Sequence, residues 1–323
     1  DAALLPIPPV ETYREFWDDQ WGQPRKIPVV FAVGPCAMDT GIKGRKTSAY
    51  LRQLARDPRV AAVVLRADSP GGEGLPSDLV ADAVRMLKKA GKPVVVSQGD
   101  VAASGGYWIS MDGTEILTTP LTITGSIGVI GAWAWDDGLT DKVGVSSEVV
   151  QRGDRADLFA AVKLPFLGGI PRRPLAEDEL ERIRHLILES YDQFITAVAT
   201  GRGLSTAEVE AVAQGRVWMG GDAIEHGLCD RFGTLDDAIA RARELGGVRD
   251  WEEIQLVEYP PRPWIEWPSF GPRLPGFFGL GDRLDRVLAG WYGLDDADPD
   301  VASALIEPAG VPGLSAFDIN YLK

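Results

Sequence analysis

The chain has 323 residues, a formal net charge of −14 at pH 7 and a hydrophobic content of 45%. This is enough apolar material for one large packed domain or two modest ones. The negative charge excludes a protein that binds a nucleic-acid backbone through clustered Lys and Arg, so no nucleic-acid partner is expected. It also disfavours a purely electrostatic attraction to anionic lipid.

The few histidines and cysteines argue against a metal site, and no cofactor is predicted. There are two of each, without metal-ligand spacing. Cys36 and Cys229 are far apart, and two buried thiols are favoured over one disulfide.

Residues 1–26, rich in Pro and Trp, are predicted to form a linker or extended arm. The sequence contains no run of about 20 apolar residues, so no transmembrane segment is expected. The first residue is Asp rather than Met, which indicates a processed product or a fragment.

The next part of the chain alternates apolar runs with helical patterns. Buried strands are predicted at 27–33, 60–66 and 93–97. Helices are predicted at 47–55, with Thr47 or Ser48 as N-cap, and at 78–90, with Ser77 as N-cap. This alternation is typical of βαβ units and predicts an α/β fold with a mostly parallel sheet covered on both faces.

Further along, the pattern predicts strand, turn and strand over 115–130, and helices at 177–200 and 236–245. Ser205-Thr-Ala-Glu208 matches a capping box at the start of another helix. The domain is predicted to span 27–258. Residues 259–323, rich in Pro, Gly and aromatic side chains, are predicted to form a C-terminal tail that packs on a neighbouring subunit or an interface.

Ser104 lies between two alanines and two glycines, directly after the third predicted strand. Small neighbours let a backbone approach its hydroxyl, as a nucleophile requires, although they would equally let a helix pack closely on a sheet. A second glycine turn, Asp68-Ser-Pro-Gly-Gly72, follows the second strand. Because the carboxyl ends of parallel strands meet at one edge of a sheet, one shared site is expected. Ser104 is the candidate nucleophile, and the N–H of Gly105 with one N–H of the Gly71-Gly72 turn could form an oxyanion hole.

The general base is harder to find. His226 is expected at a helix end and His185 on a helix surface, so neither fits beside a serine. A lysine whose pKa is lowered by burial is the natural alternative.

Several motifs in register resemble the signal peptide peptidase A (protease IV) family over residues 27–258. They are Asp68-Ser-Pro-Gly-Gly72, Lys92-Pro-Val-Val-Val-Ser97, Ala102-Ala-Ser-Gly-Gly-Tyr-Trp108, Thr124-Gly-Ser-Ile-Gly-Val129, Gly201-Arg-Gly203, Gly215-Arg-Val-Trp218 and Asp222-Ala-Ile-Glu-His-Gly-Leu228. The resemblance implies a ClpP/crotonase-like fold and a serine-lysine peptidase that cleaves remnant signal peptides. It also implies a membrane-associated protein of the bacterial cell envelope that self-associates in a ring.

The resemblance assigns roles to five residues. Ser104 would be the nucleophile, and Gly72 and Gly105 would donate to the oxyanion. Asp68 and Ser69 would lie along the substrate cleft, where an extended peptide could pair as an added strand.

The chain departs from the family at the general base. The family carries its lysine in a Gly-x-x-Lys segment, but the corresponding Gly153-Asp-Arg-Ala-Asp-Leu-Phe159 places Ala156 there. Arg155 cannot replace it, because a guanidinium does not deprotonate in proteins.

Three explanations remain open. The chain resembles the serine-bearing second half of the long members, so the lysine could come from another segment or a lysine-bearing partner chain. Lys163 could instead enter the site within the same chain. The chain could also be an inactive homologue that binds peptides or scaffolds an assembly.

A different class, a crotonase-type acyl-CoA enzyme, would also use paired backbone N–H groups. Glu73 is the one nearby carboxylate that would suit it. That reading is disfavoured because it leaves Ser104 without a role.

Overall fold

The computed structural model describes residues 23–146, 148–158, 160–164, 168–261 and 314–318. The chain divides into two compact units, one of residues 1–128 with 194–264 and the other of 129–193 with 265–323. Most of the predicted arm and of the predicted tail lies outside the described residues, so the predicted domain boundaries stay predictions.

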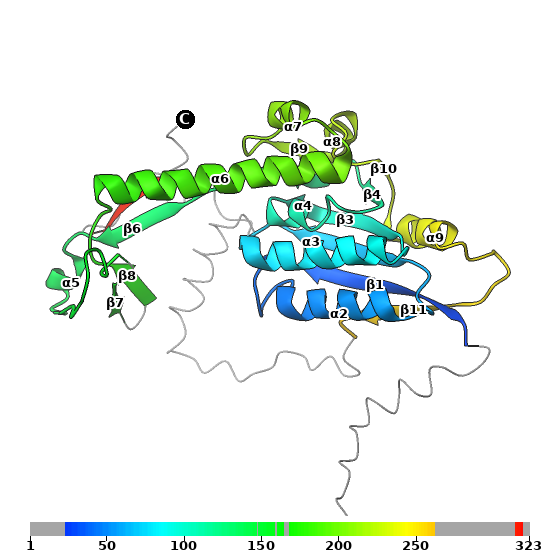
Figure 1. Ribbon diagram of the computed structural model, residues 1–323, viewed down its shortest axis with the longest axis horizontal. Helices are drawn as coiled ribbons and strands as arrows, with labels where there is room; N and C mark the ends of the chain where they lie inside the picture. The colour runs from blue at the N-terminus through cyan, green and yellow to red at the C-terminus, as the bar shows by residue number, and fades with distance from the viewer. Residues whose placement is uncertain (1–22, 147, 159, 165–167, 262–313, 319–323) are drawn as a thin grey trace, which may run out of the picture. The chain divides into compact units, whose positions relative to one another are not determined.

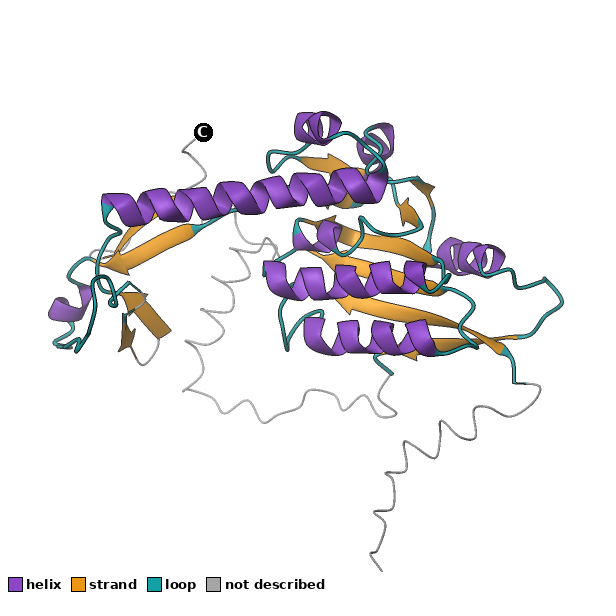
Figure 2. Ribbon diagram, viewed as in Figure 1, coloured by secondary structure: helices purple, strands orange, loops and turns teal. Residues whose placement is uncertain are grey.

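The first unit is built on one eight-stranded sheet with the strand order β10-β4-β3-β2-β1-β11, in which β5 also pairs with β3 and with β9 (Figures 1 and 2). The strands are β1 (Arg25–Val33), β2 (Val63–Ser69), β3 (Val94–Ala103), β4 (Glu115–Thr118), β5 (Ile123–Gly125), β9 (Val217–Met219), β10 (Arg231–Phe232) and β11 (Ile254–Tyr259). Every pairing is parallel except β5 with β9. The predicted α/β fold with a mostly parallel sheet is therefore confirmed.

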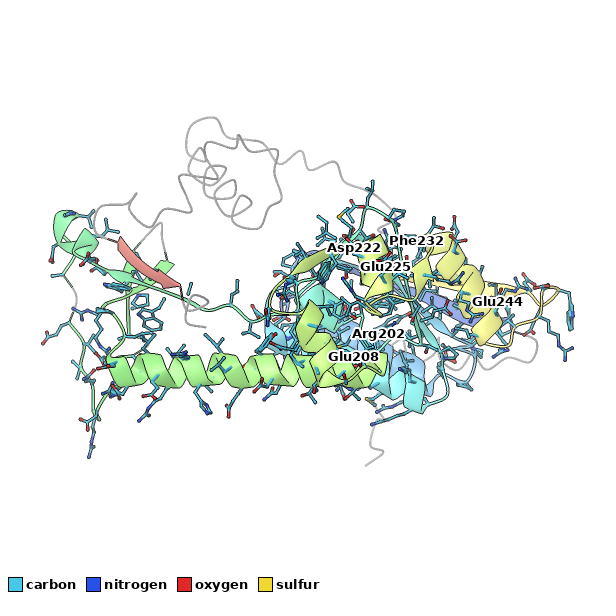
Figure 3. The ribbon with its side chains drawn as sticks, turned by 90° about the horizontal axis from the view of Figure 1, so that it is seen from above. Arg202, Glu208, Asp222, Glu225, Phe232 and Glu244 are labelled. Atoms are coloured by element: carbon cyan, nitrogen blue, oxygen red, sulfur yellow. The ribbon has the colours of Figure 1, made fainter. Side chains whose placement is uncertain are left out.

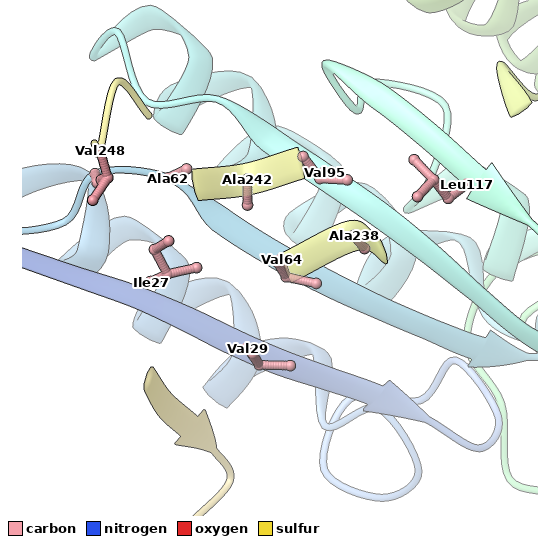
Figure 4. Close-up of a cluster of buried hydrophobic side chains, with 10 residues drawn as sticks. Ile27, Val29, Ala62, Val64, Val95, Leu117, Ala238, Ala242 and Val248 are labelled. Carbon is pink, nitrogen blue, oxygen red and sulfur yellow. The ribbon is translucent and has the colours of Figure 1, made fainter. Parts of the chain in front are cut away.

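Helices of the first unit cover this sheet. They are α2 (Gly44–Arg56), α3 (Gly74–Lys89), α4 (Gly105–Trp108), α7 (Thr206–Val212), α8 (Gly220–Glu225), α9 (Leu235–Leu245) and the C-terminal part of α6 (Glu177–Arg202). Figure 4 shows Ala238 and Ala242 of α9 against Val64, Val95 and other apolar side chains of the strands.

Both faces of the central strands are apolar. Val64 and Val95 face α9, and their neighbours Leu65 and Val96 point to the opposite face because side chains alternate along a strand. All four are 0% exposed. A sheet buried on both faces explains why these strands are continuous apolar runs in the sequence.

The helix starts agree with the sequence at α7 and differ from it at α2 and α3. The predicted cap of α3 is wrong, because the helix begins at Gly74 and Ser77 lies inside it, with its hydroxyl donating to the Glu73 carbonyl at 2.9 Å. The predicted capping box is confirmed at α7, where the Ser205 side chain accepts from the Glu208 N–H. The predicted caps of α2 are wrong, because the helix begins at Gly44 and Thr47 lies inside it, buried, with Oγ1 donating to the Ile42 carbonyl at 2.7 Å.

The C-terminal end of α6 is tied to the loop that precedes β10. Arg202, labelled in Figure 3, pairs with Asp230 at 2.6 Å and donates to the Gly227 carbonyl at 3.0 Å. Asp230 in turn accepts from the Ile116 N–H at the start of β4. These contacts anchor the Gly201-Arg-Gly203 motif at the edge of the sheet.

The second unit contains two small antiparallel pairs. β6 (Ala132–Asp136) pairs with β12 (Leu314–Asp318), and β7 (Ala161–Leu164) pairs with β8 (Gly168–Pro171). It also contains α5 (Leu139–Lys142) and the start of α6. In the described part of the chain, no helix is both long and apolar enough to cross a membrane.

Candidate active site

Ser104 lies at the junction of β3 and α4 in a strained backbone conformation, with φ 51° and ψ −118°. A positive φ is uncommon for a residue with a Cβ and persists only where the surroundings fix it. Here the Ser104 N–H donates to the Gly125 carbonyl of β5 at 2.9 Å, and its carbonyl accepts from the Trp108 N–H. The residue is half-buried, and within the described residues its hydroxyl has no hydrogen-bond partner.

The Gly71-Gly72 turn packs directly against Ser104. The two glycines have φ 105° and 140°, which side chains rarely adopt, and a Cβ added to Gly71 would lie 2.7 Å from the Ser104 Cβ and 2.8 Å from the Gly105 nitrogen. The parallel register that sets Ser69 of β2 beside Ala102 of β3 brings the two turns together. The predicted meeting of these turns at one sheet edge is therefore found in the structure.

Two backbone N–H groups at this edge are suited to bind an oxyanion. Gly105 is the first residue of α4, where N–H groups have no acceptor within a helix. The bridge between Cys36 and Gly72 uses the N–H of Cys36, to Gly71 O at 2.7 Å, and that of Glu73, to Cys36 O at 2.8 Å. The Gly72 N–H is outside that bridge. The Gly71-Gly72 turn and the start of α4 thus each present one N–H next to Ser104.

Asp68 and Ser69, the predicted substrate contacts, lie at the end of β2. Asp68 is half-buried, and its Oδ1 accepts from the Val101 N–H at 3.2 Å. Ser69 is 0% exposed, and its Oγ accepts from the Gly71 N–H at 3.2 Å. The Ser69 hydroxyl therefore supports the glycine turn, and its contact with substrate stays a prediction.

Ala156 and Lys163, the two sequence positions considered for the base, belong to the second unit. Ala156 is exposed in a turn beside Arg155, which pairs with Asp178 at 2.6 Å and with Glu179 at 3.2 Å. Lys163 lies in β7 opposite Gly169. Among the lysine side chains that the structure describes, none hydrogen-bonds to Ser104.

The histidines and cysteines take structural roles. The His226 ring packs edge-on against the Trp218 ring, with 4.2 Å between the ring centroids, and His185 faces Glu189 on α6. Both cysteines are free and buried, as predicted. Burial raises the pKa of Cys229 to about 12, so this thiol stays protonated.

Sequence reasoning missed the side chains that fix β5 next to β3. The Gln98 amide donates to Thr124 Oγ1 at 3.1 Å, and Thr124 donates to the Ala102 carbonyl at 2.7 Å. Both residues are 0% exposed. They hold the strand whose Gly125 carbonyl accepts from Ser104. The sequence signal for these contacts was a polar residue at the end of an apolar strand, because a polar group buried there is almost always paired.

The chain is similar in sequence to several known proteins. Residues 86–249 match the model of Peptidase family S49. Protease 4 of Salmonella typhi is 37% identical over 231 residues, covering 70% of this chain and 35% of that protein. The chloroplastic serine protease SPPA of Arabidopsis thaliana is 36% identical over 240 residues, covering 74% of this chain and 33% of that protein. The chain thus spans about a third of the length of these two relatives.

Among solved structures, a mutant of ClpP1 from Listeria monocytogenes is similar with a TM-score of 0.41 and 14% identity, covering 65% of this chain and 94% of that one. The family model covers half of the chain and includes Ser104, α4, β3 and β5. The chain therefore belongs to peptidase family S49.

Proposed function

We propose that this chain is the serine-bearing part of a serine-lysine endopeptidase that cleaves apolar peptides such as remnant signal peptides. The observation that carries the proposal is the strained Ser104 backbone packed against the Gly71-Gly72 turn. This arrangement sets a hydroxyl without a partner in the described residues beside two glycine N–H groups. Membership of family S49 supports the same reaction.

In this mechanism the Ser104 oxygen attacks the peptide carbonyl, and a neutral lysine amine takes its proton. The carbonyl oxygen becomes an oxyanion that accepts from the Gly72 and Gly105 N–H groups, which strengthens those bonds in the transition state. The lysine ammonium then protonates the leaving amine, and water attacks the acyl-serine by the reverse sequence of proton transfers. The mechanism thus needs a lysine, and position 156, where the family resemblance places it, holds an alanine.

We infer that the lysine comes from another segment or chain. Protease 4 of Salmonella typhi and the chloroplastic SPPA are about three times as long as the region they match, which leaves room in proteins of that length for a second, lysine-bearing part. On this basis the active form is an oligomer that acts on peptides at the membrane of the bacterial cell envelope. Asp68 and Ser69, at the end of β2, would flank the bound peptide.

Restoring the lysine tests the proposal. Ala156→Lys should confer hydrolysis of a fluorogenic leucine-rich peptide, because a positioned general base contributes roughly 100-fold or more. Ala156→Lys combined with Ser104→Ala should show no hydrolysis. The matched control is Ala156→Arg, which adds a long cationic side chain that cannot act as a base.

The outcomes for the Ser104, Ala156 and Lys163 variants lead to different conclusions. Hydrolysis that survives Ser104→Ala would contradict the proposal. Ala156→Lys protein no more active than Ala156→Arg would show that position 156 does not supply the base to Ser104. If the unaltered chain hydrolyses the peptide and Lys163→Ala abolishes that activity, Lys163 is the base within the same chain.

A further inference from the structure

Cys36 is a buried nucleophilic group that the proposed mechanism does not use, and it contacts both halves of the candidate oxyanion hole. It lies in the loop after β1, is 1% exposed, and is 33 residues from Ser69 along the chain. Its backbone bridges to Gly72, and its side chain points toward Gly105. A Cβ added to Gly105 would lie 3.1 Å from the Cys36 sulfur.

The backbone of Cys36 holds the turn on both sides of Gly72. Its N–H donates to the Gly71 carbonyl at 2.7 Å, and its carbonyl accepts from the Glu73 N–H at 2.8 Å. Two hydrogen bonds from one residue fix the orientation of the peptide groups on either side of Gly72. The direction of the Gly72 N–H is set by these neighbours.

The side chain of Cys36 continues the same support through two buried serines. The sulfur lies 3.3 Å from Ser69 Oγ, which accepts from the Gly71 N–H. On its other side it faces Ser77, whose hydroxyl donates to the Glu73 carbonyl at 2.9 Å. Since that donation uses the only Ser77 proton, Ser77 can meet the thiol only as an acceptor.

These contacts account for every main-chain polar group of Gly71 and Glu73. The two carbonyls and two N–H groups are bound by Cys36 itself or by Ser69 and Ser77, the serines on either side of its thiol. Burial raises the pKa of the Cys36 thiol, so it remains a neutral donor at physiological pH. Among the described residues, the Gly72 N–H has no acceptor.

We infer that Cys36 is a positioning residue that sets the spacing between the Gly72 and Gly105 N–H donors, through its backbone on one side and its sulfur on the other. The inference rests on the proposed oxyanion role of those two glycines. Cys36 touches neither substrate nor the reacting atoms, so it acts only through the geometry of the hole. A displaced donor loses much of its effect on a transition state.

A peptide boronic acid tests this geometry without the missing lysine, because its tetrahedral serine adduct places an oxygen where the oxyanion forms. The affinity of the full chain for a leucine-rich peptide boronic acid should fall about 10- to 100-fold in Cys36→Ala. Binding of the matching peptide amide, a ground-state mimic, should stay within about two-fold. Cys36→Ser, which keeps a hydrogen-bonding group, should recover part of the loss. The matched control is Cys229→Ala, which removes the other buried thiol.

A second measurement is independent of catalysis. Amide hydrogen exchange at Gly71 and Glu73, whose N–H groups are held by Ser69 and Cys36, should be faster in Cys36→Ala than in Cys229→Ala. Equal exchange in the two variants, or equal loss of boronate affinity, would overturn the inference. If the unaltered chain binds no boronate at Ser104, the proposed function fails, and the exchange at Gly71 and Glu73 still decides the role of Cys36.

Discussion

The glycines of the turn beside Ser104 are needed for two reasons: they adopt positive φ angles, and they leave room for the close packing of the turn against Ser104. The sequence predicted the meeting of this turn with Ser104 because both glycine pairs follow apolar strands. It could not predict Cys36, because that contact joins residues brought together only by the pairing of β1 with β2. A single cysteine after Gly34-Pro35 carries no local signal for such a role.

Replacing Gly71 tests how tightly the turn is packed. Gly71→Ala should lower the free energy of unfolding by about 2 to 5 kcal/mol, because it adds a strained φ and a clash with Ser104. Gly91→Ala is the matched control, since Gly91 also has a positive φ but open space around it. It should cost about 1 to 2 kcal/mol in the same urea titration. Equal costs for the two variants would show that the turn can move away from Ser104.

At the scale of secondary-structure elements, local hydrogen bonds decided where the sequence predictions succeeded. Ser205 caps α7 because its side chain accepts from the Glu208 N–H, a pattern contained in four consecutive residues. Thr47 looked equally suitable for α2, but it lies inside the helix, and its hydroxyl donates to the carbonyl of Ile42, which precedes the helix. Whether such a residue caps a helix or lies inside it depends on the conformation of the preceding loop, and the spacing of apolar residues does not reveal that conformation.

The capping box of α7 makes a quantitative prediction. Ser205→Ala should lower the free energy of unfolding by about 1 kcal/mol, because the Glu208 N–H loses its acceptor. Ser190→Ala is the comparison, since Ser190 is an exposed serine inside α6 whose hydroxyl bonds, within the described residues, only to the Leu186 carbonyl. Its effect should be within about 0.5 kcal/mol. Urea unfolding of both variants measures the difference, and a cost at Ser190 as large as that at Ser205 would contradict the role of the cap.

In the second unit, an ion-pair cluster holds the turn that contains Ala156. Arg173 binds Asp157 at 2.6 Å and Glu179 at 2.7 Å. Hydrogen bonds from Arg173 lower the pKa of Glu179 to about 2 and also lower the pKa of Asp157. Because these folded pKa values lie below the unfolded ones, the stabilisation is present at neutral pH and is lost as pH falls.

The pH dependence of this cluster can be measured by hydrogen exchange in the 153–158 turn. Exchange protection should be constant above about pH 5 and should decline between about pH 4.5 and pH 2, as the two carboxylates take up protons. Glu179→Gln should lower the protection at pH 7 and weaken its dependence on pH. Protection that is unchanged down to pH 2 would show that the cluster does not hold the turn.

For the whole molecule, the alternation of strands and helices was enough to predict a mostly parallel sheet. The strand order was not predictable, because β11 adds beside β1 although more than 200 residues separate them. β11 is also only half-buried, so its sequence lacks the continuous apolar run that marked the central strands. The serine and its glycines were readable from local motifs. The source of the lysine was not, because the chain has Ala156 where the family resemblance places that residue.

Covalent labelling of Ser104 is the sharpest check on its role as the nucleophile. The Ala156→Lys chain is treated with a peptide β-lactone, a serine-directed acylating probe, and the adduct is mapped by tandem mass spectrometry. We expect one acyl group on Ser104, and none after Ser104→Ala in a chain that still folds. An adduct on a different residue, or no adduct on a folded chain with Ser104 intact, would contradict it.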